Sequence, residues 1–322
     1  MNIIKLGIIG TNFVSDWMVE AVDKVQGIEK RAVYSRTDEN GRAFAAKHSI
    51  DHVYTNMEEF LSSDIDAVYI ASPNFLHYKQ TMDALRHGKH VIVEKPAALC
   101  EGEFLEMTAL AEEMGLKVME AMRPVHDPAM FEVKKNIPHL GTLRRAVFEY
   151  CQYSSRYDKF KNGEILNAFD PSLGNAALMD IGVYAVNCAV MFFGKPNDIY
   201  SKSVKLWNGM EGMGNIFLDY GEIQAEVVYS KITDSFNPSL ITGEDGCITI
   251  GKLSTVDSAA IHLRNGEQKI IASAQCENNM IYEVGDFVKF VNGTESASYF
   301  NEITRISLGI MDKVRNQNKI VF

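Results

Sequence analysis

The first third of the chain alternates short apolar runs with amphipathic stretches. Runs such as 67–71 are apolar throughout, and the stretches between the runs repeat apolar residues with the period of a helix. The expected strands are 3–9, 30–34, 67–71, 90–93 and 117–120, and the expected helices are 13–24, 39–47, 75–86 and 101–114. Apolar strands that alternate with helices are typical of a parallel sheet covered on both faces. The pattern therefore predicts a doubly wound α/β domain over residues 1–124.

The pattern changes after Met122-Arg123-Pro124. Successive strand-like runs follow one another, several through tight turns, which favours an antiparallel sheet. The expected strands are 143–153, 200–207, 214–220, 223–230, 239–243 and 247–250, and the clear helices are 176–193 and 302–315. Residues 125–322 are therefore expected to form a second α/β domain, with a mostly antiparallel sheet.

Composition supports two domains and narrows the partners. A chain of 322 residues exceeds the size at which one core usually stops growing. Its 32 Lys and Arg residues against 42 Asp and Glu residues give a net charge of −10, which repels nucleic acid and anionic membranes. Neither partner is expected, although a local basic pocket remains compatible with this charge. Without a secretion signal or a long unbroken apolar run, the chain is expected to be soluble and cytoplasmic.

Five widely spaced cysteines form no C-x-x-C pair, so they indicate reduced core thiols rather than disulfides or a zinc site. The histidines have no partners at metal-ligand spacing. No metal is expected.

The turn between the first strand and the first helix is a candidate dinucleotide site. Its residues are Gly10, Thr11, Asn12, Phe13 and Val14. The usual G-x-G-x-x-G spacing places pyrophosphate at the helix N-terminus, but Asn12 and Ser15 replace the second and third glycines. Asn can adopt the left-handed conformation, so the turn is expected to survive. The alternative is a plain strand-to-helix turn.

The end of the second strand indicates which dinucleotide would bind. NAD-binding folds place an acidic residue about 20 positions after the turn, on the ribose 2′-hydroxyl. This chain has Ser35 and Arg36 there, a hydroxyl and a guanidinium suited to a 2′-phosphate. NADP(H) is favoured and NAD(H) stays open. Alternatively, Arg36 is a solvated loop residue.

Two further segments follow apolar strands. In the first, Ser72-Pro73-Asn74 and His77, Pro73 and Asn74 suit a helix start, and the segment either serves structure alone or contacts the cofactor. In the second, Glu94-Lys95-Pro96 ends the run 90–93, where open α/β sheets bind ligands. Downstream, Asp180-x-Gly182-x-Tyr184 offers a carboxylate and a phenol to complement the cation of Lys95.

In this order, these motifs resemble the glucose-fructose oxidoreductase, inositol dehydrogenase and MocA (Gfo/Idh/MocA) family across nearly the whole chain. The resemblance implies a Rossmann domain, then an α/β domain whose large open sheet often joins subunits, and hence a homodimer or homotetramer. It also implies hydride transfer between a nicotinamide and a small sugar, polyol, diol or carbonyl substrate.

The same resemblance assigns roles to individual residues. Lys95 matches the family's lysine beside nicotinamide and substrate, where it would stabilise a developing alkoxide and also, with Glu94, border the cofactor. Asp180 and Tyr184 lie four apart on an expected helix, hence on one face. Many members have His at the position of Tyr184 and use it as acid/base. The Tyr in this chain is similar to that of the family's dihydrodiol and sugar dehydrogenases.

A phenol with a pKa near ~10 donates a proton without any shift, which favours carbonyl reduction. Asp180 would bind a hydroxyl or orient Lys95, or only order its helix. Arg123, Arg156 and Asn167 are candidate substrate contacts. The alternatives are a hinge ion pair of Arg123 with Glu120, and a solvated loop surface for Arg156 and Asn167. Two other functions stay open: a nicotinamide-dependent glycoside hydrolase and a non-catalytic regulatory protein.

Overall fold

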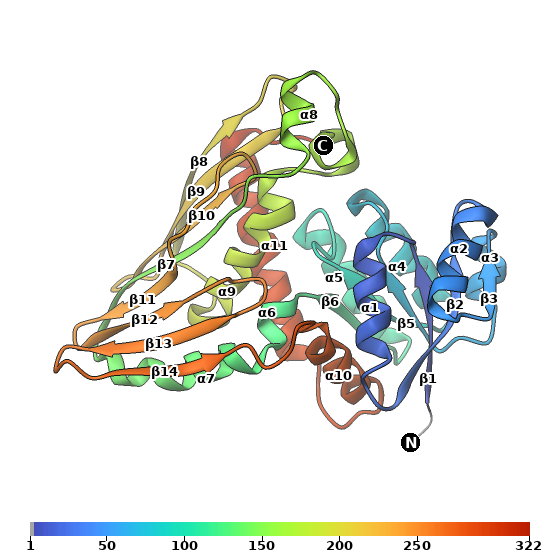
Figure 1. The fold of residues 1–322 in the computed structure, drawn as a ribbon, viewed down its shortest axis with the longest axis horizontal. Coiled ribbons are helices and arrows are strands. Elements are labelled where there is room, and N and C mark those ends of the chain that lie inside the picture. The colour runs from blue at the N-terminus through green and yellow to red at the C-terminus, as the bar shows by residue number, and fades with distance from the viewer. Residues whose placement is uncertain (1–2) are drawn as a thin grey trace. The chain divides into compact units, whose positions relative to one another are not determined.

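The computed structural model describes residues 3–322 and divides into two compact units. Unit 1 comprises the chain through Met122 together with the later segment Asn278–Glu302, and unit 2 comprises Arg123–Glu277 and Ile303–Phe322. Figure 1 shows the elements of both units in chain order. The segment 278–302, which the sequence prediction assigned to the second domain, clusters with unit 1.

Unit 1 is built on a six-stranded sheet in the order β3-β2-β1-β4-β5-β6, with every neighbouring pair parallel. Its strands are β1 (Ile4–Ile9), β2 (Ile28–Tyr34), β3 (His52–Tyr54), β4 (Ala67–Ile70), β5 (His90–Glu94) and β6 (Val118–Ala121). Its helices are α1 (Phe13–Val22), α2 (Asp38–His48), α3 (Met57–Leu61), η1 (Asn74–Leu76), α4 (His77–Arg86), α5 (Glu101–Glu113) and α10 (Met280–Val291). This is the predicted doubly wound Rossmann order, with the direction of the strand order reversing between β1 and β4. The short β3 and α3 were not predicted.

The α10 segment joins unit 1 because its apolar face completes that core. Met280, Val284, Phe287 and Phe290 are buried and belong to the same hydrophobic cluster as Leu6. Helix α11 (Ser298–Asn318) begins in unit 1 and ends in unit 2. The sequence prediction missed α10 because this helix returns to strands that lie far earlier in the chain.

Unit 2 contains an eight-stranded sheet in the order β14-β13-β12-β11-β7-β10-β9-β8. Its strands are β7 (Leu143–Cys151), β8 (Asp198–Lys205), β9 (Glu211–Asp219), β10 (Gln224–Ser230), β11 (Ser239–Gly243), β12 (Gly246–Ile250), β13 (Ser258–Leu263) and β14 (Gln268–Ser273). Its short helices are α6 (Arg123–His126), α7 (Pro128–Asn136), η2 (Ile137–Leu140), α8 (Tyr157–Lys161), η3 (Asn167–Phe169) and η4 (Pro171–Leu173). The pairings are antiparallel except for β7 with β10, which confirms the expected mostly antiparallel sheet.

One face of this sheet is covered by helix and the other carries exposed aromatic residues. Helix α9 (Val183–Phe193) contacts β7 and β10, and Phe148 and Val227 on those strands are fully buried. On neighbouring strands, Tyr200 and Phe217 are 60% and 47% exposed. The sheet therefore has an open face, as the family resemblance implied.

The helical stretch Pro171–Phe193 is long and apolar enough to cross a membrane, with a mean hydropathy of 1.7, although no such stretch was expected. Isolated polar residues interrupt it, so it does not form an unbroken apolar run. Within the structure 83% of its most apolar window is buried, which is also the behaviour of a core helix in a globular unit.

The assignment of α10 to unit 1 predicts that Phe287→Ala lowers the free energy of unfolding of unit 1 by about 3–5 kcal/mol, because a fully buried ring is lost. Trp17 lies in unit 1 and Trp207 in unit 2, so urea unfolding followed by fluorescence in a Trp207→Phe background reports on unit 1. Leu105→Ala on α5 is the control. That side chain is 46% exposed, and the change should cost about 0.5 kcal/mol. Equal effects of the two variants would contradict the assignment.

Candidate active site

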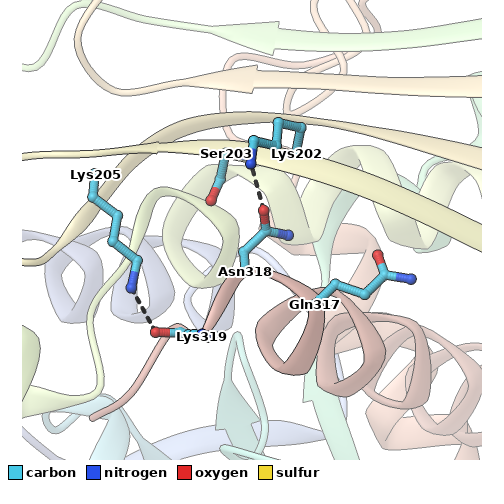
Figure 2. A pocket seen from close by; sticks show the side chains of 6 residues that line it. All are labelled: Lys202, Ser203, Lys205, Gln317, Asn318 and Lys319. Atoms are coloured by element: carbon cyan, nitrogen blue, oxygen red, sulfur yellow. Dashed lines mark hydrogen bonds between the residues drawn. The ribbon is translucent and has the colours of Figure 1, made fainter.

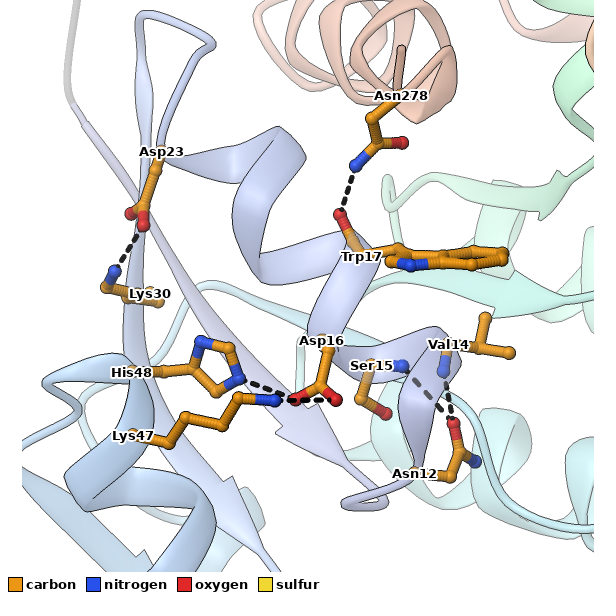
Figure 3. Close-up of polar contacts among 10 residues, drawn as sticks. All are labelled: Asn12, Val14, Ser15, Asp16, Trp17, Asp23, Lys30, Lys47, His48 and Asn278. Atoms are coloured by element: carbon orange, nitrogen blue, oxygen red, sulfur yellow. Dashed lines mark hydrogen bonds and ion pairs between the residues drawn. The ribbon is translucent and has the colours of Figure 1, made fainter.

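Asn12 caps helix α1 with its side chain (Figure 3). Its Oδ1 accepts hydrogen bonds from the amides of Val14 at 2.9 Å and Ser15 at 3.2 Å, and its Nδ2 donates to the carbonyl of Ala71 at 2.8 Å. Its φ of −91° is extended, so the expected left-handed conformation is wrong. The Asn12 side chain instead stabilises the turn as a helix cap, because it accepts hydrogen bonds from two amides that have no partner within the helix.

Gly10 is the position in this turn that requires glycine. Its φ is +106°, and an added Cβ would lie 2.8 Å from the carbonyl oxygen of Ala71. The ends of β1 and β4 thus approach each other through Gly10 and Ala71, and Asn12 bonds the same carbonyl. The turn is therefore closely packed, and the Phe13 amide is the first-turn amide that the Asn12 side chain does not cap.

Ser35 and Arg36 follow β2 and precede α2. Ser35 is buried, with its amide bonded to the carbonyl of Tyr54 at 3.0 Å, whereas Arg36 is exposed. Thr37 is the N-cap of α2. Arg36 therefore directly precedes the N-cap of a helix, and helix N-termini favour anions.

His77 holds two of the predicted segments together. Its Nδ1 lies 2.8 Å from the carbonyl oxygen of Pro96 and its Nε2 lies 2.9 Å from that of Ser72. The ring is buried, and burial lowers the pKa of His77 while the two carbonyl contacts favour the charged form. Both ring nitrogens face backbone atoms, so the side chain serves the packing of these loops. The Ser72 hydroxyl likewise donates to Oε1 of Gln80 at 2.7 Å.

Glu94 is held inside unit 1. Tyr69 donates its hydroxyl to Oε1 of Glu94 at 2.7 Å, and the amide of Lys95 lies 3.3 Å from Oε2. The peptide bond between Lys95 and Pro96 is cis. The backbone around Lys95 is thus determined by the neighbouring carboxylate and by His77.

In unit 2, Asp180 and Tyr184 are each paired with a cation. Asp180 lies in η5 (Leu178–Gly182), a π-helical turn that leads into α9, where an α-helix was expected. Its Oδ2 lies 2.7 Å from Nζ of Lys231. The Tyr184 ring is 6% exposed, and its hydroxyl accepts a hydrogen bond of 3.4 Å from Nη2 of Arg123. The ring of Tyr150 packs edge-on against it at 5.5 Å. Turns of π-helix occur often at functional sites.

A buried carboxyl group lies against this π-helical turn. Glu211 is fully buried, and its Oε2 accepts from the amide of Leu178 at 2.9 Å. An added Cβ on Gly214 would meet both the Tyr229 hydroxyl and Oε1 of Glu211, so the phenol and the carboxyl group lie over the same glycine. Burial raises the pKa of Glu211 to about 7, against the opposing effects of the Leu178 amide, Tyr229 and Lys231.

Gly182 lies against the same tyrosine. A Cβ at this position would come within 3.0 Å of the Tyr229 ring. This close approach explains the glycine between Asp180 and Tyr184.

The other predicted substrate residues are less constrained. Arg156 is exposed at the start of α8, and Asn167 is exposed at the start of η3, where its carbonyl accepts from Nδ2 of Asn175 at 2.6 Å. Of the three candidates, Arg123 contacts Tyr184 through its guanidinium.

The sequence reasoning missed Lys231 and Glu211. Lys231 directly follows β10, just as Lys95 follows the expected strand at 90–93, so its position at a strand end could have indicated a site residue. Glu211 opens β9, and nothing in its local sequence distinguishes it from a surface carboxylate.

A separate surface pocket lies in unit 2, with a volume of about 380 Å³ (Figure 2). Its lining residues are Lys202, Ser203, Lys205, Gln317, Asn318 and Lys319. Lys205 donates to the carbonyl of Lys319, and the Ser203 amide donates to Asn318. None of the predicted site residues line it, so it is not part of the candidate active site.

Across residues 3–322 no group of three His, Cys, Asp or Glu side chains is arranged to hold a metal ion. All five cysteines are unpaired, but Cys188 alone of them is fully buried, so the expectation of core thiols is right for that residue and wrong for the other four, which are partly exposed.

Comparison with known proteins identifies extensive similarity. The family model described as "Oxidoreductase family, NAD-binding Rossmann fold" matches residues 4–122. The scyllo-inositol 2-dehydrogenase (NADP(+)) of Bacillus subtilis is 41% identical over 99% of this chain and 98% of its own length. An uncharacterized oxidoreductase of Escherichia coli is 35% identical over 99% of this chain and 98% of its own.

A solved structure shares the fold. A 3-ketoreductase from Actinomadura kijaniata, in complex with NADP and TDP-benzene, superposes with a TM-score of 0.87 at 22% identity. The match covers 98% of each chain.

The capping geometry of Asn12 predicts a charge effect on dinucleotide binding. In Asn12→Asp the acceptor that caps α1 is kept, but a carboxylate is added where pyrophosphate would lie, so NADPH binding should weaken by about tenfold or more. Asn56 caps α3 with the same pattern of two amide contacts, so Asn56→Asp is the matched control. Fluorescence titration with NADPH measures both. Equal affinity in the two variants would exclude Asn12 from the cofactor turn.

The buried Glu211 predicts a pH dependence of stability. Its folded pKa of about 7 lies above the ordinary value of 4.5, so the folded state binds the proton more tightly and loses stability as pH rises between these values. Glu211→Gln removes this loss. Relative to wild type, the variant should gain up to about 3 kcal/mol of unfolding free energy between pH 4.5 and pH 8. Urea unfolding at both pH values measures it, and a pH-independent difference would contradict the assignment.

Proposed function

The chain belongs to the Gfo/Idh/MocA family of NAD(P)-dependent oxidoreductases, and we propose that it interconverts a secondary alcohol of a cyclic polyol or sugar and the corresponding ketone with NADP(H). The end-to-end similarity to a relative named scyllo-inositol 2-dehydrogenase (NADP(+)) supports this substrate class and this cofactor. The relatives that match along their whole length are named as a dehydrogenase and an oxidoreductase, which favours this function over the glycoside hydrolase and regulatory alternatives.

The observation that carries the proposal is the pairing of Tyr184 with Arg123. The Arg123 guanidinium donates a hydrogen bond of 3.4 Å to the phenol oxygen, which holds the hydroxyl in a defined orientation. Asp180 lies on the same helical segment and is paired with Lys231. A proton donor and a hydroxyl acceptor on one segment, each beside a cation, suit a substrate with adjacent oxygens.

The residues of unit 1 fit a dinucleotide. The reversal of strand order between β1 and β4 places the Gly10 turn where doubly wound folds bind nucleotides, and Gly10 packs directly on the end of β4. The proposed cofactor-binding residues are Gly10, Thr11, Asn12, Phe13, Val14, Ser35, Arg36, Ser72, Pro73, Asn74, Glu94 and Lys95. Arg36 at the N-terminal end of α2 supports a 2′-phosphate, hence NADP(H). His77 supports these segments from within.

Each catalytic residue has a distinct role in the reductive direction. NADPH, when bound, supplies the hydride that goes to the carbonyl carbon. Tyr184 donates the proton of its hydroxyl to the carbonyl oxygen, and Arg123 orients that hydroxyl through its hydrogen bond. The Lys95 ammonium stabilises the negative charge that develops on the substrate oxygen before that proton arrives. Asp180 accepts a hydrogen bond from a neighbouring substrate hydroxyl. The reverse sequence oxidises the alcohol.

The proposal extends to assembly and location. The open face of the unit 2 sheet, with exposed Tyr200 and Phe217, supports a homodimer or homotetramer formed through that face. A small-molecule substrate and a cytoplasmic location fit the same function. Arg156 and Asn167 are proposed to contact larger substrates at the margin of the active site.

Turnover of a panel of inositols and aldoses with NADP⁺ or NAD⁺, followed at the ~340 nm absorbance of the reduced cofactor, tests the function. The wild type should turn over at least one cyclic polyol, with NADP⁺ preferred. Lys95→Met and Tyr184→Phe should each lower kcat by about 100-fold or more, because each removes a group that acts on the reacting oxygen.

NADPH affinity should be kept in Tyr184→Phe, since Tyr184 lies in unit 2 and the proposed cofactor residues lie in unit 1. Exposed Lys313→Met is the control and should turn over normally. Activity that persists in Lys95→Met would disprove the assigned chemistry.

A further inference from the structure

Lys231 is a buried lysine that joins three separate segments of unit 2. The residue is 3% exposed. Its Nζ lies 2.7 Å from Oδ2 of Asp180 on the π-helical turn and donates to the carbonyl of Ala168 at 2.8 Å. The same atom lies 5.1 Å from the centre of the Phe169 ring. Lys231 and Ala168 are 63 positions apart in the chain, so this contact closes a long loop.

The segment that Lys231 fastens is an aromatic layer. Phe169 stacks with Phe160 at 5.0 Å and with Tyr157 at 5.5 Å, and Trp207 stacks on Phe160 at 4.8 Å. Tyr157 and Phe160 are part of α8 and Phe169 is part of η3, the region of the proposed substrate contacts Arg156 and Asn167, and Trp207 follows β8. The position of this layer therefore depends on the contacts of the Lys231 ammonium with Ala168 and Phe169.

The main chain also fixes the lysine itself. Its amide donates to the carbonyl of Gly212 at 3.0 Å, and its carbonyl accepts from the amide of Ser154 at 2.9 Å. Because both of its backbone groups are hydrogen-bonded, the main chain from which the Lys231 side chain extends is held in place. Two further ionisable groups lie near this turn, because Glu211 accepts from the amide of Leu178 and the Gly182 backbone packs on the ring of Tyr229.

A stability role alone does not account for this arrangement. Burying an ammonium costs several kcal/mol, and replacing a buried ion pair by apolar residues is often neutral or stabilising. The lysine is 4% exposed and its partner Asp180 is 37% exposed at the side chain, so the pair has a buried end and an open end. The more exposed member of the pair is Asp180, whose carboxylate is proposed to bind the substrate.

We propose that Lys231 is a positioning residue that fixes the Asp180 carboxylate toward the substrate and fastens the Asn167–Phe169 segment at the same point. The claim rests on the proposed function. In this arrangement the Asp180 carboxylate acts as a hydrogen-bond acceptor for a substrate hydroxyl. One ammonium thus sets both the orientation of the acceptor and the place of the adjoining aromatic layer.

A double-mutant cycle tests whether Lys231 acts through Asp180. Lys231→Met keeps an apolar stem beside Phe169 and should lower kcat/KM for the preferred polyol by about 100-fold, the effect of a displaced contact at the reacting centre. In an Asp180→Asn background the same change should cost less than about fivefold, because the interaction has already been lost. Lys313→Met, which removes an exposed lysine paired with Asp198, is the control and should leave kcat/KM unchanged. Additive effects in the cycle would overturn the proposal.

The pH profile separates positioning from simple destabilisation. In Lys231→Met the acidic limb of kcat/KM should move to higher pH, because Asp180 loses the cation that favours its charged form. Lys231→Arg keeps a cation and should restore the limb. Loss of folded protein scales the whole profile without moving the limb, and an unmoved limb would overturn the proposal.

Failure of the proposed function is distinguishable from failure of this inference. If the wild type turns over no polyol with either dinucleotide, the function is wrong. Amide hydrogen exchange, which needs no substrate, then decides the placement. Lys231→Met should speed exchange in residues 166–170 and 178–182 relative to Lys313→Met. Equal exchange in the two variants would overturn the positioning role.

Discussion

The apolar helix that carries Asp180 and Tyr184 must bury its length and still present two polar side chains. The stretch Pro171–Phe193 is mostly buried against the sheet of unit 2. A carboxylate or a phenol in such a setting is costly unless another group compensates it. The structure supplies that compensation from elsewhere in the chain, with Lys231 beside Asp180 and Arg123 beside Tyr184. The proposed catalytic side chains and the cations beside them are therefore parts of one packed unit.

Unit 1 follows the same principle at the carboxyl ends of its strands. Asn12 satisfies two helix amides and the end of β4, and His77 faces two loop carbonyls. Glu94 accepts from a buried tyrosine. Side chains that the sequence suggests as ligand contacts thus also hold the loops in shape. A site assembled this way is organised before any cofactor arrives.

The sequence pattern predicted those features that depend on neighbouring residues, such as strands and helices. The alternation of apolar runs and helices located most strands of both sheets to within a few residues, and the motif order led to the family. The π-helical turn was read as α-helix, because it is a single turn within a longer apolar helical stretch, whose overall pattern it leaves in place. Asn12 was expected to imitate glycine, whereas its amide group offered a better use as a cap. Strand β14 was missed because its residues are all exposed or half-buried and show no alternation. Strand β13 was missed although its buried residues, Ala259 and Ile261, do alternate with more exposed ones. The partners of Asp180 and the place of α10 depend on residues far apart in sequence, which periodicity does not encode.

The late segment of unit 1 has a consequence for biosynthesis. A ribosome delivers the chain from its N-terminus, so β1 to β6 emerge well before α10. Until residues 278–302 have been made, the apolar surface of the sheet that Phe287 and its neighbours cover lacks that cover. The whole of unit 2 up to Glu277 is also translated in this interval. The nascent chain thus carries an unfinished nucleotide-binding fold for most of its synthesis, a state in which exposed apolar surface attracts chaperones and other nascent chains.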